Sequence, residues 1–349
     1  MKLYKKILIL LIIIIFSFIL FKLLKKRYEI LNKRENFLGL NSSAESELSN
    51  AKDTSNSAGI QSLSKSYFDL PLSQYVIKAS YNSALTGSYI SLDMLKYVLS
   101  RGCRFLDFEI YNINNAPYVA YSTDPTYSIL ETENKILLDN VLSSAVTNGF
   151  NSPSPNTSDP LFIHLRIKSN SNDIYNSVAK SIYNSVGSRL YTNFIDENTK
   201  YSDIMGKVVI VMDKTINYNY KIFTKCGTND KSCYDLTRFI NIESGSEFLK
   251  LTKYSDVLNK KINPPNINNN NITTDVQTMQ IVLPNMDNNN IKNPLFDTFV
   301  AKYGCQLVTY RFYNKDEELE NYERFFKDNK FAFLPMTLAL QYFKKKDAN

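Results

Sequence analysis

Two short segments of the chain carry charged side chains at every second position, between apolar residues. Asp107 and Glu109 alternate with apolar residues in RFLDFEI, and His164 and Arg166 do the same in LFIHLRI. Because successive side chains of a β-strand point to opposite faces, each pair is expected to share one face. Carboxylates near an imidazole can serve in acid/base chemistry, and their oxygens can hold a cation. For Asp107, Glu109 and Arg166, however, a structural ion-pair cluster is favoured over a functional one.

His164 is the single histidine of the chain, and four cysteines accompany it. A lone histidine lacks a second group for acid/base exchange, so we expect a buried residue held by a hydrogen bond rather than a relocated base. Cys103 and Cys305 are expected to be buried as small apolar residues. Cys226 and Cys233 could close a loop disulfide or bind a metal, but free thiols in a reducing compartment are favoured.

The elements that would position these residues alternate between strand and helix. A helix is expected from the N-cap Ser91 to Gly102, and it leads directly into the strand 104–110. The strand 161–167 precedes an apolar helical stripe, and a third strand is expected at 207–212. This alternation predicts a parallel α/β sheet, and charged residues on the inner face suit the interior and mouth of a barrel.

The first 34 residues hold most of the excess positive charge. The chain of 349 residues has a formal net charge of +7, while residues 1–34 contain nine Lys and Arg against one Glu. The body is therefore close to neutral, which argues against nucleic-acid binding. Residues 7–21 are all apolar except Ser17, and this apolar run lies between the two basic clusters.

This run predicts one uncleaved transmembrane helix within residues 1–34, because it approaches the length of about 20 residues that spans a bilayer. A cleaved signal peptide is the alternative, but no small-x-small cleavage site follows. The more basic flank after the run favours the cytoplasmic side for the body. Residues 35–65 are rich in Ser, Asn and Ala and are expected to be a flexible linker, and residues 66–349 are expected to form one barrel.

Seven segments resemble, in order, the X and Y regions of phosphoinositide-specific phospholipase C. These segments are PLSQYVIKASYNSALTG at 71–87, GCRFLDFEIY at 102–111, APYVAYST at 116–123, PLFIHLRIK at 160–168, MGKVVIVMDK at 205–214, QIVLP at 280–284 and YGCQLVTYRF at 303–312. The resemblance implies a distorted TIM (β/α)8 barrel of the PLC-like phosphodiesterase type, an α/β fold. Its X-like half would cover about 67–214, an irregular connection about 215–232 and its Y-like half about 233–340.

The resemblance also assigns positions to the catalytic groups of the family, which uses two histidines and a calcium ion. The two histidine positions hold Tyr81 and Tyr121. Tyrosine has an ordinary pKa near 10, so at neutral pH it would stay protonated. The family's phosphate-binding lysines leave only Lys207 and Lys214, because an apolar residue and an aspartate stand at the other two positions.

The calcium-ligand positions of the family correspond to Asn82, Asp107 and Glu109, and the remaining glutamate is replaced by Arg166. A guanidinium about 4 Å from a dication costs on the order of 8 kcal/mol at an effective dielectric of about 20. Calcium should therefore be displaced.

These replacements together favour a membrane-anchored PLC-like protein that lacks phosphodiesterase activity and acts as a binding or structural protein, with no cofactor. The alternative is an active phosphodiesterase with non-standard, calcium-independent chemistry, in which Arg166 is the electrophile and Tyr81 or Tyr121 carries the proton. Calcium is considered only under this alternative. The expected partners are a lipid membrane and, at its surface, anionic phospholipid headgroups or a protein.

Overall fold

The structure is a computed structural model that describes residues 15–22, 25, 43–52, 59–226, 233–259, 267–268, 271–272, 278–285 and 292–347. Most of the predicted anchor at 1–34 lies outside these residues. No helix in the described ranges combines the length and hydropathy needed to cross a bilayer.

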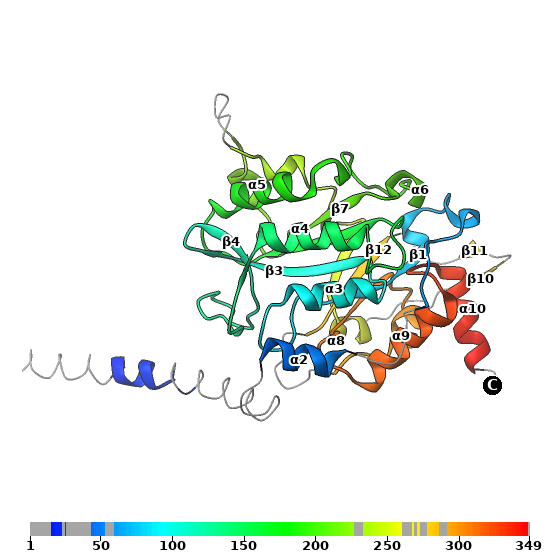
Figure 1. Cartoon of the computed structure of the whole chain (residues 1–349), viewed down its shortest axis with the longest axis horizontal. Coiled ribbons are helices and arrows are strands. Elements are labelled where there is room, and N and C mark those ends of the chain that lie inside the picture. The colour runs from blue at the N-terminus through cyan, green and yellow to red at the C-terminus, as the bar shows by residue number, and fades with distance from the viewer. Residues whose placement is uncertain are drawn as a thin grey trace, which may run out of the picture.

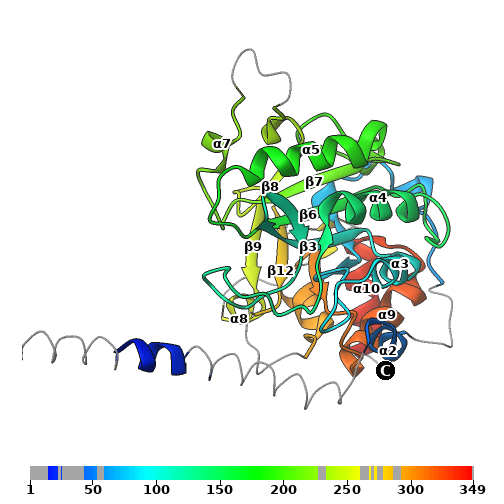
Figure 2. The ribbon, with the colours of Figure 1, turned by 60° about the vertical axis from the view of Figure 1, so that its left-hand side comes forward.

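Eight strands of the described chain form a nearly closed barrel in which every neighbouring pair is parallel (Figures 1 and 2). β8 and β9 lie side by side at the remaining opening. In order around the barrel, the strands are β8 (Ile242–Ser244), β7 (Val208–Asp213), β6 (Leu161–Ile167), β3 (Phe105–Ile113), β2 (Ala79–Ser80), β13 (Leu307–Tyr310), β12 (Met279–Leu283) and β9 (Leu249–Lys253).

Shorter strands extend and close the barrel. β4 (Ala116–Val119) and β5 (Ile136–Leu137) form an antiparallel extension beside β3. β1 (Tyr75–Ile77) pairs antiparallel with β14 (Phe333–Pro335). The side chains of β1 and β14 pack against interior residues near the amino ends of β3, β6 and β7, so this ribbon closes that end of the barrel. A separate antiparallel pair consists of β10 (Ile267–Asn268) and β11 (Asn271–Ile272).

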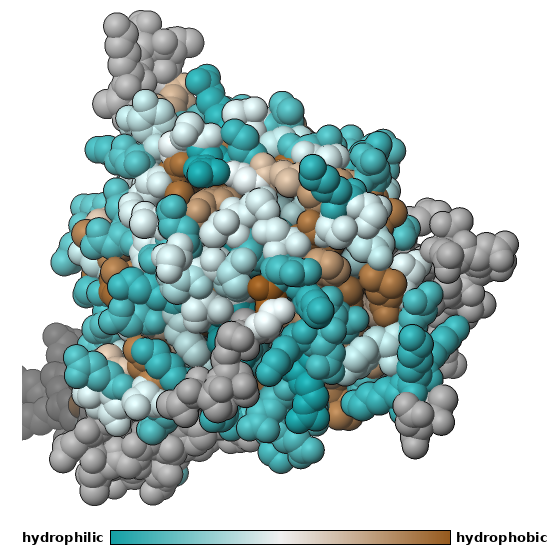
Figure 3. Space-filling view, turned by 45° about the vertical axis from the view of Figure 1, so that its right-hand side comes forward, coloured by the Kyte–Doolittle hydropathy of each residue, from teal (hydrophilic) through white to brown (hydrophobic). Residues whose placement is uncertain are grey.

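Helices cover the outside of the barrel (Figure 1). They are α3 (Leu92–Ser100), α4 (Leu138–Gly149), α5 (Ile174–Val186), α6 (Tyr201–Ile204), α7 (Tyr220–Phe223), α8 (Tyr254–Leu258), α9 (Glu317–Asn329) and α10 (Met336–Asp347). Their apolar faces complete a core that encloses both sides of the sheet. On the face shown in Figure 3, hydrophilic side chains predominate and the hydrophobic ones form separate patches.

The sequence pattern explains α3 and the strand that follows it. The hydroxyl of Ser91 accepts a hydrogen bond from the backbone N–H of Met94, as an N-cap should. Gly102 has φ +81°, and a Cβ at this residue would lie 2.8 Å from a side-chain carbon of Ile60. Glycine therefore permits both the reversal of the chain and the close packing that deliver β3 into the barrel. The predicted parallel α/β barrel is confirmed.

The expected flexible linker at 35–65 is wrong for part of its length. Helix α2 (Ala44–Ala51) begins at the N-cap Ser43 and packs on the barrel with Leu48 and Ala51 buried. The carboxylate of Glu47 is also buried and accepts hydrogen bonds from the Thr86 hydroxyl at 2.6 Å and the Ser88 backbone N–H at 2.9 Å. Eight residues are too few for a stable isolated helix, so these tertiary contacts hold α2 in place.

Replacing Glu47 by alanine should release α2 from the barrel. Hydrogen bonds to a charged group contribute about 1.5–3 kcal/mol, so amide exchange in 44–51 should accelerate by about tenfold to a hundredfold. Hydrogen–deuterium exchange with mass spectrometry measures this directly. Glu45→Ala is the matched control, because Glu45 lies on the same helix and is exposed. Equal acceleration in both variants would contradict the role assigned to Glu47.

The prediction of free thiols at Cys226 and Cys233 is also wrong, because these residues form a disulfide with a Cα–Cα distance of 5.6 Å. The bond follows α7, in the connection between β7 and β8. The thiols of Cys103 and Cys305 are buried and form no disulfide within the described part of the chain, as predicted.

We expect two of the four cysteines to react with a maleimide in the unfolded, unreduced chain, and all four to react after reduction. The reactive pair should be Cys103 and Cys305, which become accessible only on unfolding. Mass spectrometry of the alkylated protein counts the modified residues. Four modifications without a reductant would show that the disulfide is absent.

Candidate functional site

The predicted charged residues meet inside the barrel on β3 and β6. The parallel register pairs Asp107 with His164 and Glu109 with Arg166, so two charged layers face the interior. All four side chains are buried. The alternation in the sequence therefore placed these residues correctly.

Arg166 is the centre of the cluster and contacts three polar residues. Its Nε donates to Asp107 Oδ1 at 2.8 Å and its Nη2 donates to Asp107 Oδ2 at 2.6 Å. Its Nη1 donates to Glu109 Oε1 at 2.7 Å, and Nη2 also donates to Asn82 Oδ1 at 3.0 Å. Asn82 has φ +42°, and its backbone N–H donates to Asp107 Oδ2 at 3.0 Å. One guanidinium thus binds all three residues that the resemblance assigned to calcium.

A second cation completes the charge balance of Glu109. Lys168 Nζ donates to Glu109 Oε2 at 2.8 Å and to the Ser122 carbonyl at 2.9 Å, and the Tyr111 hydroxyl donates to the same Oε2 at 2.7 Å. Burial alone would raise the pKa of Glu109, but Arg166 and Lys168 hold it below its usual value. Burial lowers the pKa of Lys168.

His164 lies one layer deeper than Arg166 and is fully buried. Its Nδ1 is 2.8 Å from Asp107 Oδ1, and its Nε2 is 2.8 Å from the Ser244 hydroxyl. Burial would raise the pKa of Asp107, but Arg166 and the hydrogen bond from His164 lower it well below its usual range. Both imidazole nitrogens are engaged, as expected of a structural histidine.

Tyr81 and Tyr121 are the residues that the resemblance assigns to the positions of the family's two histidines. The guanidinium carbons of Arg166 and Arg311 lie over the Tyr81 ring, 4.8 and 5.8 Å from its centre. The Tyr81 hydroxyl makes a long contact of 3.5 Å with Glu109 Oε1. Burial raises the pKa of both tyrosines well above 10, and burial raises that of nearby Tyr313 to about 12. At neutral pH these phenols stay protonated, so they can donate a hydrogen bond but cannot act as bases.

Sequence reasoning missed two cations at the mouth of the barrel. Arg311 follows β13 and donates to the carbonyls of Lys292 and Asn285. Lys253 ends β9, and its pKa is lowered to about 8 by burial and by the charge of Arg166. Both residues lie at the carboxyl ends of strands, where the side chains of a parallel barrel converge. This position in the sequence, at the end of a strand, could have identified them as site residues.

The predicted substrate-binding role of Lys207 does not fit its place in the fold. Lys207 directly precedes β7, and its Nζ donates to the Ser188 carbonyl. A strand of six residues spans about 20 Å, so Lys207 lies at the opposite end of the barrel from Asp213. Lys214 follows β7 on the correct side, but its Nζ lies 4.0 Å from Glu243.

The residues present do not fit a calcium ion. Calcium needs six to eight oxygen ligands at about 2.3–2.6 Å, whereas Arg166 engages oxygens of Asn82, Asp107 and Glu109. Within the described ranges, no group of three or more His, Cys, Asp and Glu side chains is arranged to hold a metal ion.

Fold and site together define an α/β barrel with a polar interior at the carboxyl ends of its strands, which is the usual place of the active site in this architecture. Residues 68–214 match the family model "Phosphatidylinositol-specific phospholipase C, X domain". This match confirms the resemblance over residues 68–214, and the barrel is a fold shared with solved phospholipase C structures.

The chain is similar to PLC21 from L. pealei, with 17% identity and a TM-score of 0.57 over 77% of this chain and 37% of that one. It is similar to PLC21 from S. officinalis over the same shares, with 17% identity and a TM-score of 0.56. The chain thus spans little more than a third of these two proteins. A calcium-dependent phosphoinositol-specific phospholipase C from Pseudomonas sp. gives 11% identity and a TM-score of 0.49, over 80% of this chain and 99% of that one. Among curated proteins, no match is found.

Proposed function

We propose that this protein is a membrane-associated, PLC-like binding or structural protein without phosphodiesterase activity. The observation that carries the proposal is the Arg166 guanidinium, which bonds to Asn82, Asp107 and Glu109. These are the positions at which the family binds calcium, so the oxygens that would hold a calcium ion to polarise a phosphate are engaged by Arg166 instead. The tyrosines at the two histidine positions cannot act as bases at neutral pH.

The alternative, in which Arg166 replaces calcium as the electrophile, has less support. Four hydrogen bonds to protein oxygens occupy the guanidinium, which has five N–H donors. A phosphate that approached Arg166 would also meet the buried carboxylates of Asp107 and Glu109. Binding it there would require breaking strong charge-assisted bonds.

We further propose that residues 1–34 anchor the protein in a membrane by one helix, on the strength of their apolar run and basic flanks. The Cys226–Cys233 disulfide is typical of oxidising compartments, and it favours the non-cytoplasmic side for the barrel. This orientation is the reverse of the one that the charge bias predicts. In sealed membranes from the native host, the barrel should be protected from added protease, and digestion before detergent is added would contradict this orientation.

The assay for activity uses the full chain in detergent micelles with phosphatidylinositol and with a chromogenic phosphodiester. We expect no turnover above background, either with calcium or with a chelator. A phospholipase C that retains both histidines serves as the positive control. Turnover that is lost in Tyr121→Phe or in Arg166→Met would overturn the proposal in favour of the alternative chemistry.

A further inference from the structure

A cationic pocket lies on the outer wall of the barrel, where α2, α3 and α9 lie close together (Figures 1 and 2). Its volume is about 340 Å³. The side chains that define it come from α3, from α9 and from the loop that joins β13 to α9. The pocket is separate from the Arg166 cluster, which lies inside the barrel.

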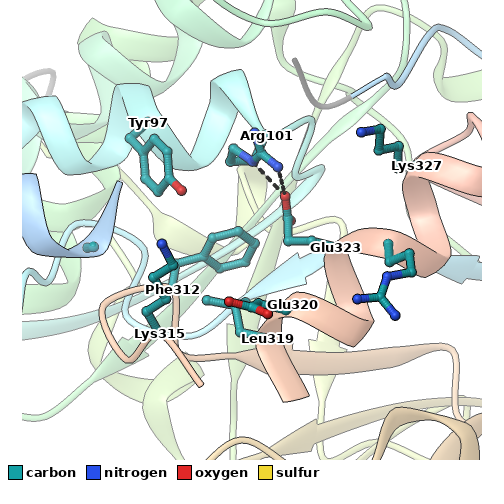
Figure 4. A pocket seen from close by; sticks show the side chains of 10 residues that line it. Tyr97, Arg101, Phe312, Lys315, Leu319, Glu320, Glu323 and Lys327 are labelled. Carbon is teal, nitrogen blue, oxygen red and sulfur yellow. Dashed lines mark hydrogen bonds and ion pairs between the residues drawn. The ribbon is translucent and has the colours of Figure 1, made fainter. Parts of the chain in front are cut away.

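The pocket has a fixed floor built on one ion-pair network. Glu323 Oε1 lies 2.6 Å from Nζ of the fully buried Lys78, and Glu323 Oε2 lies 2.5 Å from Arg101 Nη2. Figure 4 shows the Arg101 and Glu323 side chains joined at the pocket, with Phe312 and Lys315 on one side and Lys327 on the other. One carboxylate therefore binds two buried or nearly buried cations at the floor of the pocket.

Three further cations line the same pocket and are not neutralised. Lys315, Arg324 and Lys327 are exposed, and none of them makes a side-chain hydrogen bond or ion pair with any residue in the described part of the chain. Lys327 is nonetheless positioned, because its stem lies across Gly59, 3.0 Å from where a Cβ would stand. Glu320 is the single carboxylate that lines the described pocket besides Glu323.

We propose that this pocket binds a phosphate group. A phosphomonoester carries between one and two negative charges at neutral pH and offers three acceptor oxygens, which suits several converging cations better than a carboxylate with one charge. The apolar atoms of Phe312 and Leu319 line the same space, so it accommodates a short glycerol-like group beside the phosphate. The ligand class is therefore a glycerol-linked phosphate, either soluble or as a lipid headgroup.

The test uses the full chain in neutral detergent micelles and isothermal titration calorimetry. One arm titrates glycerol 3-phosphate, and the other titrates phosphatidic acid in mixed micelles. The pocket variant is Arg324→Glu with Lys327→Glu. The control is Lys180→Glu with Lys250→Glu, which changes the net charge equally at exposed residues outside the pocket.

We expect saturable binding in at least one arm, weakened about tenfold or more in the pocket variant and less than twofold in the control, because two charge-assisted contacts are removed. Binding in both arms identifies the glycerol-linked phosphate that the two ligands share. Binding in the lipid arm alone identifies a headgroup in its membrane, and binding in the soluble arm alone identifies a soluble phosphate. Lack of saturable binding in both arms, or equal weakening in the two variants, overturns the proposal. Neither result depends on whether the barrel interior hydrolyses phosphodiesters.

Discussion

Arg166→Met is expected to lower the free energy of unfolding by about 3–5 kcal/mol at pH 7, because it leaves the buried Asp107 without a cation and Glu109 with Lys168 alone. Methionine keeps most of the apolar volume, so the loss reports charge and hydrogen bonding rather than a cavity. Asp107 and Glu109 are fully buried and together accept three of the four hydrogen bonds from Arg166. Denaturant unfolding of the detergent-solubilised chain measures the change. The matched control is Arg238→Met, at an exposed arginine, and it should change stability by less than about 0.5 kcal/mol.

The pH dependence of this loss separates charge from packing. In the wild type, the pKa values of Asp107 and Glu109 are lowered on folding. Their contribution to stability is therefore complete above the unfolded pKa values, near 4, and is lost as the pH falls through the lower folded values. In the variant the carboxylates can protonate more easily, so the stability difference from wild type should shrink below about pH 4. A constant difference between pH 7 and pH 3 would contradict the ion-pair explanation.

The two charged layers of the site could be predicted because side chains along a β-strand alternate between its two faces. Asp107 and Glu109 on one strand, and His164 and Arg166 on the next, must share the inner face if their apolar neighbours pack against helices. The parallel register of the two strands then places Asp107 beside His164 and Glu109 beside Arg166. The strand pattern alone could not predict that Arg166 also reaches Asn82, because this contact depends on the turn after β2, and only the resemblance to the family brought the two residues together.

The errors arose where position in space depends on distant contacts. Lys207 aligned with the phosphate-binding segment of the family, but it precedes β7 and so lies at the end of the barrel opposite to the carboxyl ends of the strands. Helix α2 lacks a long apolar pattern, and its main anchor, Glu47, finds partners about 40 residues further along the chain. The Cys226–Cys233 disulfide was left open as an alternative, because cysteine spacing alone did not decide between a disulfide and free thiols.

Arg166→Glu is expected to create a calcium site where the wild type has none. The substitution exchanges the cation for a third carboxylate among Asn82, Asp107 and Glu109, and carboxylate and amide oxygens are the ligands that calcium prefers. Without a metal, three buried carboxylates repel one another, so the calcium-free variant should be strongly destabilised.

Calcium at a hundred times its dissociation constant would stabilise the variant by about 2.7 kcal/mol, whereas it should leave the wild type unchanged. Thermal unfolding in calcium and in a chelator, with magnesium as the control ion, measures the difference. Magnesium should have a smaller effect, because it demands near-ideal octahedral geometry and gives up its waters reluctantly. Equal stabilisation of wild type and variant by calcium would show that Arg166 does not exclude the ion. A variant that calcium does not stabilise would show that the remaining oxygens no longer have the geometry of a metal site. Only the expected result, a calcium response confined to the variant, identifies the arginine itself as the group that takes the place of the metal.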